Sequence, residues 1–214
     1  MSRTIRRIAI AGALLLLASV GVAVAQETTR CDTSKCVGTP QNDTLVASDG
    51  ENTVLAKGGD DDVELDETIA VGSDDIGRGG RGQDCIDGGA GADLMIGGPG
   101  DDNRPCEFTA FVNPRAALTA GPGDDIVLGR KGDDSLDGIT GSDKLVGGAG
   151  DDVIDDPAPS DSDRLLGRRG NDELTSTDAD GDDLVDGGRG TDSCTGDSGD
   201  VFVRCETVTP VPAG

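Results

Sequence analysis

An all-β repeat fold is the class that the sequence predicts, and three observations predict it. A nine-residue unit recurs along most of the chain, with glycine favoured at its first, second and fourth places and aspartate at its sixth. A large aliphatic residue follows at the eighth place, so each unit ends in a minimal three-residue strand. The hydrophobic content of 34% is low for a globular domain but supplies one inward side chain per unit. We therefore expect short strands joined by glycine-rich turns.

The period is regular enough to define a register. Two copies keep the whole pattern: GGAGADLMI (88–96) and GGAGDDVID (147–155). Less regular copies are 38–46, 47–55, 56–64, 79–87, 120–128, 129–137, 138–146 and 167–175. Unit 47–55 carries Asn52 where the others carry aspartate, and a long break separates the copies at 103–119. Elsewhere the steps are nine residues or up to four residues longer, so a chance origin of the period is negligible.

The spacing of glycine and aspartate, which recurs from unit to unit, favours a cation site. Glycine permits positive φ and lets backbone carbonyls converge without a Cβ between them. Aspartate supplies a hard anionic oxygen, which suits Ca²⁺ and its six to eight oxygen ligands. Two stacked turns would hold an ion between them. The predicted calcium ligands are Asp43, Asp61, Asp74, Asp84, Asp93, Asp102, Asp125, Asp134, Asp143, Asp152, Asp163, Asp172, Asp183 and Asp192.

The core is predicted to consist of the aliphatic residues at the eighth place, because strand alternation turns them inward. They are Leu45, Val54, Val63, Ile76, Ile86, Met95, Val127, Leu136, Leu145, Ile154, Leu165, Leu174 and Val185. Arg104 and Cys194 break the rule, the first where the array is interrupted and the second near the C-terminal end.

The repeat GGxGxDxUx, where U is a large aliphatic, resembles the repeats-in-toxin (RTX) calcium-binding nonapeptides over roughly residues 38–200. The resemblance implies a right-handed parallel β-roll, in which each unit is half a coil and stacks on the next unit but one. We expect two stacked arrays, 38–105 and 120–200, with a cap or interruption at 106–119. A Cys-containing segment at 26–37 and a cap and tail at 201–214 complete the predicted organisation.

The charge of the chain points to a cationic partner. The net charge is −24, with 42 acidic against 18 basic residues, which would favour disorder unless the carboxylates bind cations. Several Ca²⁺ ions are the predicted partners, and we expect the chain to be largely disordered without them. Nucleic acid is not expected as a partner, because the net negative charge would repel its phosphates. The protein partner, if there is one, is unknown.

The N-terminus has the pattern of a secretory signal peptide. Three arginines precede an apolar run from Ile8 to Ala25, and Ala23-Val24-Ala25 offers a small-x-small cleavage site. The run is also long enough for a membrane anchor. With residues 1–25 removed, the chain is expected to be an extracellular bacterial protein without membrane contact.

The six cysteines fit an exported protein, in which they are expected to pair. They form three local clusters, and pairing within each cluster is one prediction among fifteen connectivities. A zinc site is the alternative, but the chain has no histidine and no paired CxxC spacing. The disulfide candidates are Cys31, Cys36, Cys85, Cys106, Cys194 and Cys205.

Three other stretches allow two interpretations each. GDSGD at 196–200 is similar to a serine-protease nucleophile motif, but that chemistry needs a histidine base and the sequence contains no histidine. A degenerate last repeat explains the match better. DADGDDLVD at 178–186 fits an extra calcium loop or a plain insertion. The interruption at 103–118 fits a linker or cap, or a partner-binding patch made by Phe108 and Phe111.

The functional prediction is a secreted calcium-binding protein that is not an enzyme. No catalytic histidine exists in the sequence, and neither HExxH nor GxSxG occurs. In the RTX family such rolls often accompany proteases or lipases, so the alternative is an accessory, adhesion or scaffold module of an extracellular system.

Overall fold

Short parallel strands build the whole described part of the chain. The computed structural model describes residues 28–31, 34–66, 72–106, 116–157, 162–177 and 182–211. The predicted signal peptide and both Phe108 and Phe111 lie outside these residues, as do residues 178–181 of the DADGDDLVD stretch. Within the described residues, no helix is long and apolar enough to cross a membrane.

The strands alternate along the chain between two sheets, which we call the odd and the even sheet. The odd sheet has ten strands in sequential order: β1 (Thr28–Cys31), β3 (Thr44–Ala47), β5 (Asp62–Glu64), β7 (Cys85–Asp87), β9 (Leu118–Pro122), β11 (Ser135–Thr140), β13 (Val153–Asp156), β15 (Glu173–Ser176), β17 (Ser193–Asp197) and β19 (Thr207–Val211). The even sheet has nine: β2 (Lys35–Val37), β4 (Thr53–Gly58), β6 (Ile76–Arg81), β8 (Leu94–Pro99), β10 (Ile126–Lys131), β12 (Lys144–Ala149), β14 (Arg164–Arg169), β16 (Leu184–Arg189) and β18 (Val201–Val203).

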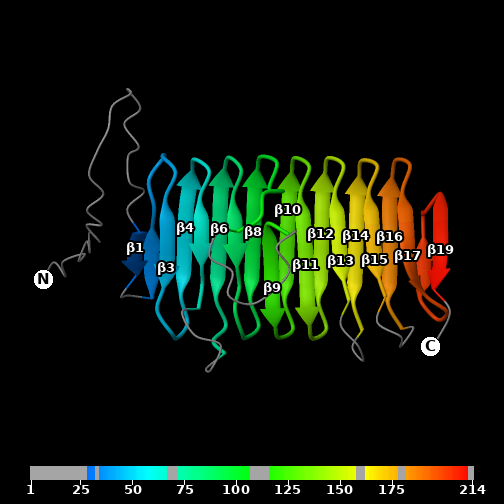
Figure 1. The fold of residues 1–214 in the computed structure, drawn as a ribbon, viewed down its shortest axis with the longest axis horizontal. Helices are drawn as coiled ribbons and strands as arrows, with labels where there is room; N and C mark the ends of the chain where they lie inside the picture. Colours follow the sequence, from blue (N-terminus) through cyan, green and yellow to red (C-terminus); the bar gives the residue numbers. More distant parts are fainter. Residues whose placement is uncertain are drawn as a thin grey trace, which may run out of the picture.

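Each strand pairs in parallel with the next but one, so two consecutive strands make one coil of a solenoid. Figure 1 shows the coils stacked along one axis, with the N-terminal coil at one end and the C-terminal coil at the other. The all-β parallel roll expected from the repeat is therefore confirmed.

The two predicted arrays form one continuous solenoid. β7 pairs with β9 and β8 pairs with β10, so both sheets run past the interruption. The interrupting segment leaves the roll between Asp102 and β9, and the strand that follows it re-enters in register, with Leu118 opposite Leu136. The insertion thus interrupts the sequence period without interrupting either sheet.

A single row of aliphatic side chains from each sheet fills the interior. Twelve of the thirteen predicted core residues are buried, from Leu45 to Val185, at 1% exposure or less. The thirteenth, Ile76, is a correction, because it pairs with Leu94 and faces outward while Gly77 takes the inward place opposite Met95. A Cβ at Gly77 would lie 2.9 Å from the Ile86 side chain, so a neighbouring coil fills the space.

Three disulfides join residues that are near in sequence: Cys31–Cys36, Cys85–Cys106 and Cys194–Cys205. These are the local pairs expected from the cysteine clusters. The first and third lie in the two end coils, and the second holds the start of the insertion against β7. Inward-facing Cys194 also explains why no aliphatic occurs at its position, since it is fully buried in the core.

Candidate metal centre

The aspartate at the sixth place of each unit points into its own turn. This requires glycine at the first place, where a Cβ would collide with the carboxylate. At Gly129 an added Cβ would lie 2.3 Å from Oδ2 of Asp134, and at Gly147 it would lie 2.2 Å from Oδ2 of Asp152. Backbone carbonyls share the same space, since a Cβ at Gly167 would lie 2.6 Å from the carbonyl oxygen of Gly187 in the next coil. Each turn therefore encloses oxygen atoms from two coils.

The aspartates that precede the odd strands form one continuous column, which we call the odd ladder. Its members are Asp43, Asp61, Asp84, Asp102, Asp134, Asp152, Asp172, Asp192 and Glu206. The backbone N–H of each aspartate donates to a carboxylate oxygen of the next member at 2.7–3.0 Å. The bond from Asp102 to Asp134 carries the ladder across the interruption.

The even ladder is the matching column before the even strands. Its members are Asn52, Asp75, Asp93, Asp125, Asp143, Asp163, Asp183 and Asp200. Asn52, in the least regular unit, keeps its place in this column and donates its backbone N–H to Asp75 at 2.6 Å. The predicted ligands thus divide between two edges of the roll, as expected for half-coil units.

One predicted ligand lies elsewhere. Asp75, and not Asp74, occupies the even ladder, so the sequence register in this unit was wrong by one residue. Asp74 is exposed and belongs to an outer row formed by the fifth place of each unit, where it accepts a hydrogen bond from the backbone N–H of Ala92. Asp133 and Asp151 have the same outer position on the other edge.

Each ladder leaves carboxylate oxygens buried and without a hydrogen-bond partner. One carboxylate oxygen accepts the ladder bond, and the other, Oδ2, points into the turn. Within the described residues, Oδ2 has no hydrogen-bond partner in Asp61, Asp84, Asp93, Asp102, Asp125, Asp134, Asp152, Asp172 and Asp192. A buried carboxylate oxygen without a partner is costly, and coordination by a cation is one of the few arrangements that satisfies it. Hard oxygen donors in this density fit Ca²⁺.

The ladder carboxylates have raised pKa values, because they are buried and lie close to one another. Burial, reinforced by the negative charge of neighbouring ladder members, raises the pKa of Asp125 and of Asp134 to about 8. Burial likewise raises the pKa of Asp84 and of Asp93 to about 7. The N–H bonds along the ladder lower each pKa but do not offset burial. A divalent ion would favour the charged carboxylates and reverse these shifts.

The sequence interpretation missed additional carboxylates that lie beside the even ladder. Two of them occur where an odd strand leads into a lengthened turn: Asp66 lies two residues after β5, and Asp156 is the last residue of β13. Both are buried. Asp143, Asp156 and Asp163 each place one carboxylate oxygen within 4.8 Å of the other two. No simple rule in the sequence identifies them, because Ser176, which pairs with Asp156, takes the same place before another lengthened turn.

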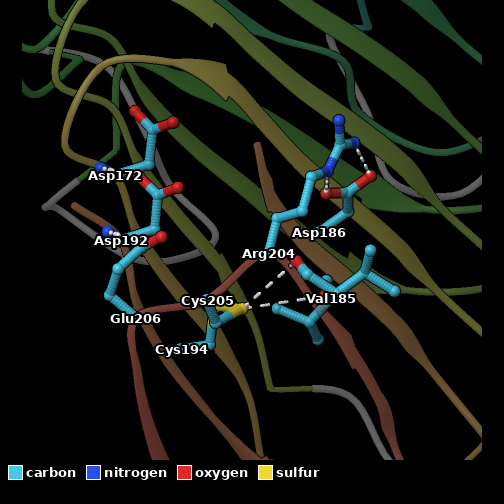
Figure 2. The surroundings of a disulfide bond; sticks show 9 residues. Asp172, Val185, Asp186, Asp192, Cys194, Arg204, Cys205 and Glu206 are labelled. Carbon is cyan, nitrogen blue, oxygen red and sulfur yellow. Dashed lines mark hydrogen bonds and ion pairs between the residues drawn. A yellow bond between two sulfur atoms is a disulfide. The ribbon is translucent and has the colours of Figure 1, made fainter. Parts of the chain in front are cut away.

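The last coil adds two ladder members that the nonapeptide pattern did not identify. In the GDSGD stretch, Asp200 accepts the N–H of Asp183, so the motif is a final turn of the roll. At the other edge, Glu206 accepts the N–H of Asp192 at 2.7 Å. Figure 2 shows Asp172, Asp192 and Glu206 stacked in successive coils, next to the disulfide between Cys194 and Cys205.

Comparison with known proteins agrees with this geometry. The profile of the RTX calcium-binding nonapeptide repeat matches four segments of the chain: residues 37–67, 69–103, 119–154 and 175–203. The chain belongs to this RTX repeat family. No curated protein and no solved structure matches the chain. The RTX match covers both sides of the interruption, in agreement with the continuous ladders.

Membership of the RTX family identifies the ligand of the repeats as calcium. The family repeat binds Ca²⁺, and the buried Oδ2 atoms together with the convergent carbonyls supply donors that suit this ion. The protein is therefore a calcium-binding β-roll.

Proposed function

We propose that this protein is a secreted, non-catalytic β-roll whose folding is driven by calcium. The observation that carries the proposal is the repetition, among the described residues, of buried Oδ2 atoms without a hydrogen-bond partner: they recur from Asp61 to Asp192 along the odd ladder and at Asp93 and Asp125 in the even ladder. In a chain with a net charge of −24, stacking these carboxylates without a cation opposes folding. Calcium binds only the assembled turns, so its binding free energy becomes folding free energy.

Each ion would lie between two stacked turns of one ladder, held by aspartate Oδ2 atoms and backbone carbonyls. Asp61 to Asp192 in the odd ladder and Asp75 to Asp183 in the even ladder are the proposed ligands. The ions supply charge neutralisation and cross-link neighbouring coils. The residues themselves set the spacing, because the N–H bonds of 2.6–3.0 Å hold successive carboxylates in one column.

Circular dichroism of the purified protein during a calcium titration tests the folding proposal, with magnesium as the control. We expect a transition from coil to β-structure with calcium and none at equal concentrations of magnesium, which keeps its octahedral water shell. An unchanged β spectrum in chelator would show that the core and disulfides suffice, and would refute calcium-driven folding.

Secretion is tested by the mass of the protein recovered from its source. We expect a chain that begins at Gln26 and contains three disulfides, because the apolar segment before it has the signal-peptide pattern. A mass that includes residues 1–25 would show that the segment is retained. The absence of histidine from the sequence supports a non-catalytic role, since the common general base is missing.

A further inference from the structure

Basic residues are segregated to one side of this acidic roll. Every lysine and arginine in the described strands, except Arg30, lies in an even strand. The turns that lead from odd to even strands carry none in their described residues. The positive charge of the described strands is thus concentrated on the outer face of the even sheet and at the C-terminal ends of its strands.

Several of these residues lie where the backbone favours glycine. Lys57, Arg130 and Arg168 have φ of 91°, 92° and 85°, and they share one column with Gly80, Gly98, Gly148 and Gly188, whose φ values are also positive. Left-handed backbone is unfavourable for a residue with a Cβ. Non-glycine residues in such an unfavourable backbone conformation are typical of functional sites, so we infer that these basic side chains have a function.

The basic residues border a groove with an aliphatic floor. One hollow of about 410 Å³ is lined by Leu128, Val146, Arg130, Lys131 and Arg169. A second, of about 350 Å³, shares Arg130 and Lys131 with it and adds Arg78 and Ile96. The two hollows continue along the axis of the roll from β6 to β14. We call them together the even-sheet groove.

The charges of this groove are available to a ligand. The side chains of Arg130, Lys131 and Arg169 form no hydrogen bond or ion pair with any described residue, although carboxylates abound in the chain. By contrast, Arg204 pairs with Asp186 and Lys57 donates to the carbonyl of Gly38. Guanidinium groups bind oxyanions through paired N–H donors, so the groove suits an anionic ligand.

We propose that the even-sheet groove binds a linear anionic polysaccharide along the axis of the roll. Lys131 and Arg169, which both line the first hollow, are two coils apart, or about 10 Å, which calls for anionic groups that recur along an extended polymer. The half-buried floor of Leu128 and Val146 suits the apolar faces of sugar rings. Single-stranded nucleic acid fits less well, because the sequence has no tryptophan or tyrosine on which bases stack.

The backbone offers a variant that removes charge without harming the fold. Arg130→Gly takes away a residue that lines both hollows and replaces it with the residue found in its column neighbours. Lys57→Gly is the matched control: it makes the same change of charge at the same φ, but Lys57 lines neither hollow. Arg169→Ala, which removes another charge that lines the first hollow, can be combined with Arg130→Gly.

Fluorescence anisotropy with labelled dextran sulfate in saturating calcium tests the proposal, with uncharged dextran as the ligand control. We expect binding of dextran sulfate alone, a loss of about tenfold for Arg130→Gly, a larger loss for the double variant and less than twofold for Lys57→Gly. The calcium response in circular dichroism should remain, which separates this proposal from calcium-driven folding.

Three outcomes would overturn the proposal. Absence of dextran sulfate binding would exclude the ligand class. An equal loss of affinity for Lys57→Gly and Arg130→Gly would show that binding depends on the net charge and not on the groove. Binding of phosphatidylglycerol vesicles but not of the polysaccharide, or self-association abolished by Arg130→Gly, would assign the groove to a membrane or to a second copy.

Discussion

At the scale of single residues, the roll depends on which atoms may occupy the inside of a turn. The first glycine of a unit leaves room for the carboxylate of the same turn, as Gly129 does for Asp134. The two oxygens of the aspartate differ, because one accepts the ladder bond while the other points into the turn without a hydrogen-bond partner and is the proposed calcium ligand. Neither residue can be replaced without affecting both the turn and the site.

Because the two carboxylate oxygens differ in their roles, the effect of Asp134→Asn can be predicted. The amide oxygen can still accept the N–H of Asp102, but the anionic Oδ2 is lost. We expect the calcium affinity of the adjacent sites to fall by about tenfold, or about 1.4 kcal/mol, in isothermal titration calorimetry. Asp133→Asn is the control, since Asp133 is exposed and lies in the outer row. Equal effects of the two variants would contradict the assignment of Oδ2 as a ligand.

Backbone strain at Ile139 gives a second prediction at this scale. Ile139 is a β-branched residue at φ 93°, opposite Gly121 in the neighbouring coil. Because left-handed backbone disfavours such a side chain, we expect Ile139→Gly to raise the free energy of unfolding by about 1 kcal/mol. Urea denaturation in saturating calcium measures this change.

Gly121→Ala is the reciprocal test of the same column. A Cβ at Gly121 would lie 1.8 Å from the carbonyl oxygen of Gly89, and its φ is 109°. We expect this variant to be destabilised by about 2 kcal/mol or more. If Ile139→Gly also destabilised the protein, the packing of the isoleucine side chain would outweigh its backbone strain.

At the scale of the strand and turn, the repeat predicts nearly everything that is periodic. The spacing of aspartates predicted both ladders, and strand alternation predicted twelve inward side chains. The prediction failed where the period offers two equivalent residues, as at Asp74 and Asp75. Where two aspartates are consecutive, as at 60–61, 101–102 and 133–134, the second one belongs to the ladder. Choosing the second aspartate of each pair would have selected Asp75.

Features without a period could not be predicted in the same way. Asp156 lies beside Asp143 and Asp163 only because one turn is lengthened, and the geometry of an insertion is not encoded in the repeat. Likewise, the even-sheet groove arises from residues at several places of the unit, and it is visible only when alternate units are stacked on one sheet. Sequence periodicity defines the scaffold, while departures from it distinguish this member of the family.

The ladders as elements should respond to pH, and the sign follows from the raised pKa values. Asp125 and Asp134 have a pKa of about 8 in the calcium-free roll, against 3.8 as the ordinary value. The folded state therefore holds protons that the unfolded state releases, so this contribution to stability is complete below about pH 4 and is lost as the pH rises to about 8. Calcium competes with the same protons.

We thus expect calcium affinity to rise with pH between about 6 and 8, with protons released on binding. Calorimetry in buffers of different ionisation enthalpy measures the number of protons released. In chelator, residual β-structure should be greatest in acid and least at alkaline pH. No proton release at pH 7 would show that the ladder carboxylates are already ionised in the calcium-free protein.

At the scale of the whole molecule, the roll behaves as a one-dimensional stack. Each coil contacts its neighbours through parallel strand pairs, and the contacts between strands are dominated by partners two strands apart. Stability in such a stack is a sum of coil and interface contributions, and the end coils have only one neighbour. The disulfides Cys31–Cys36 and Cys194–Cys205 lie in those end coils.

This arrangement predicts that loss of an end disulfide opens one end of the roll and spares the rest. Changing Cys194 and Cys205 to serine removes a link across 11 residues, which should destabilise the C-terminal coils by about 2–3 kcal/mol. Hydrogen exchange in saturating calcium should then accelerate in β16 to β19 and remain slow in β8 to β12. The matching change at Cys31 and Cys36 should open the opposite end. Uniform acceleration along the whole roll would instead show that the coils unfold as a single cooperative unit.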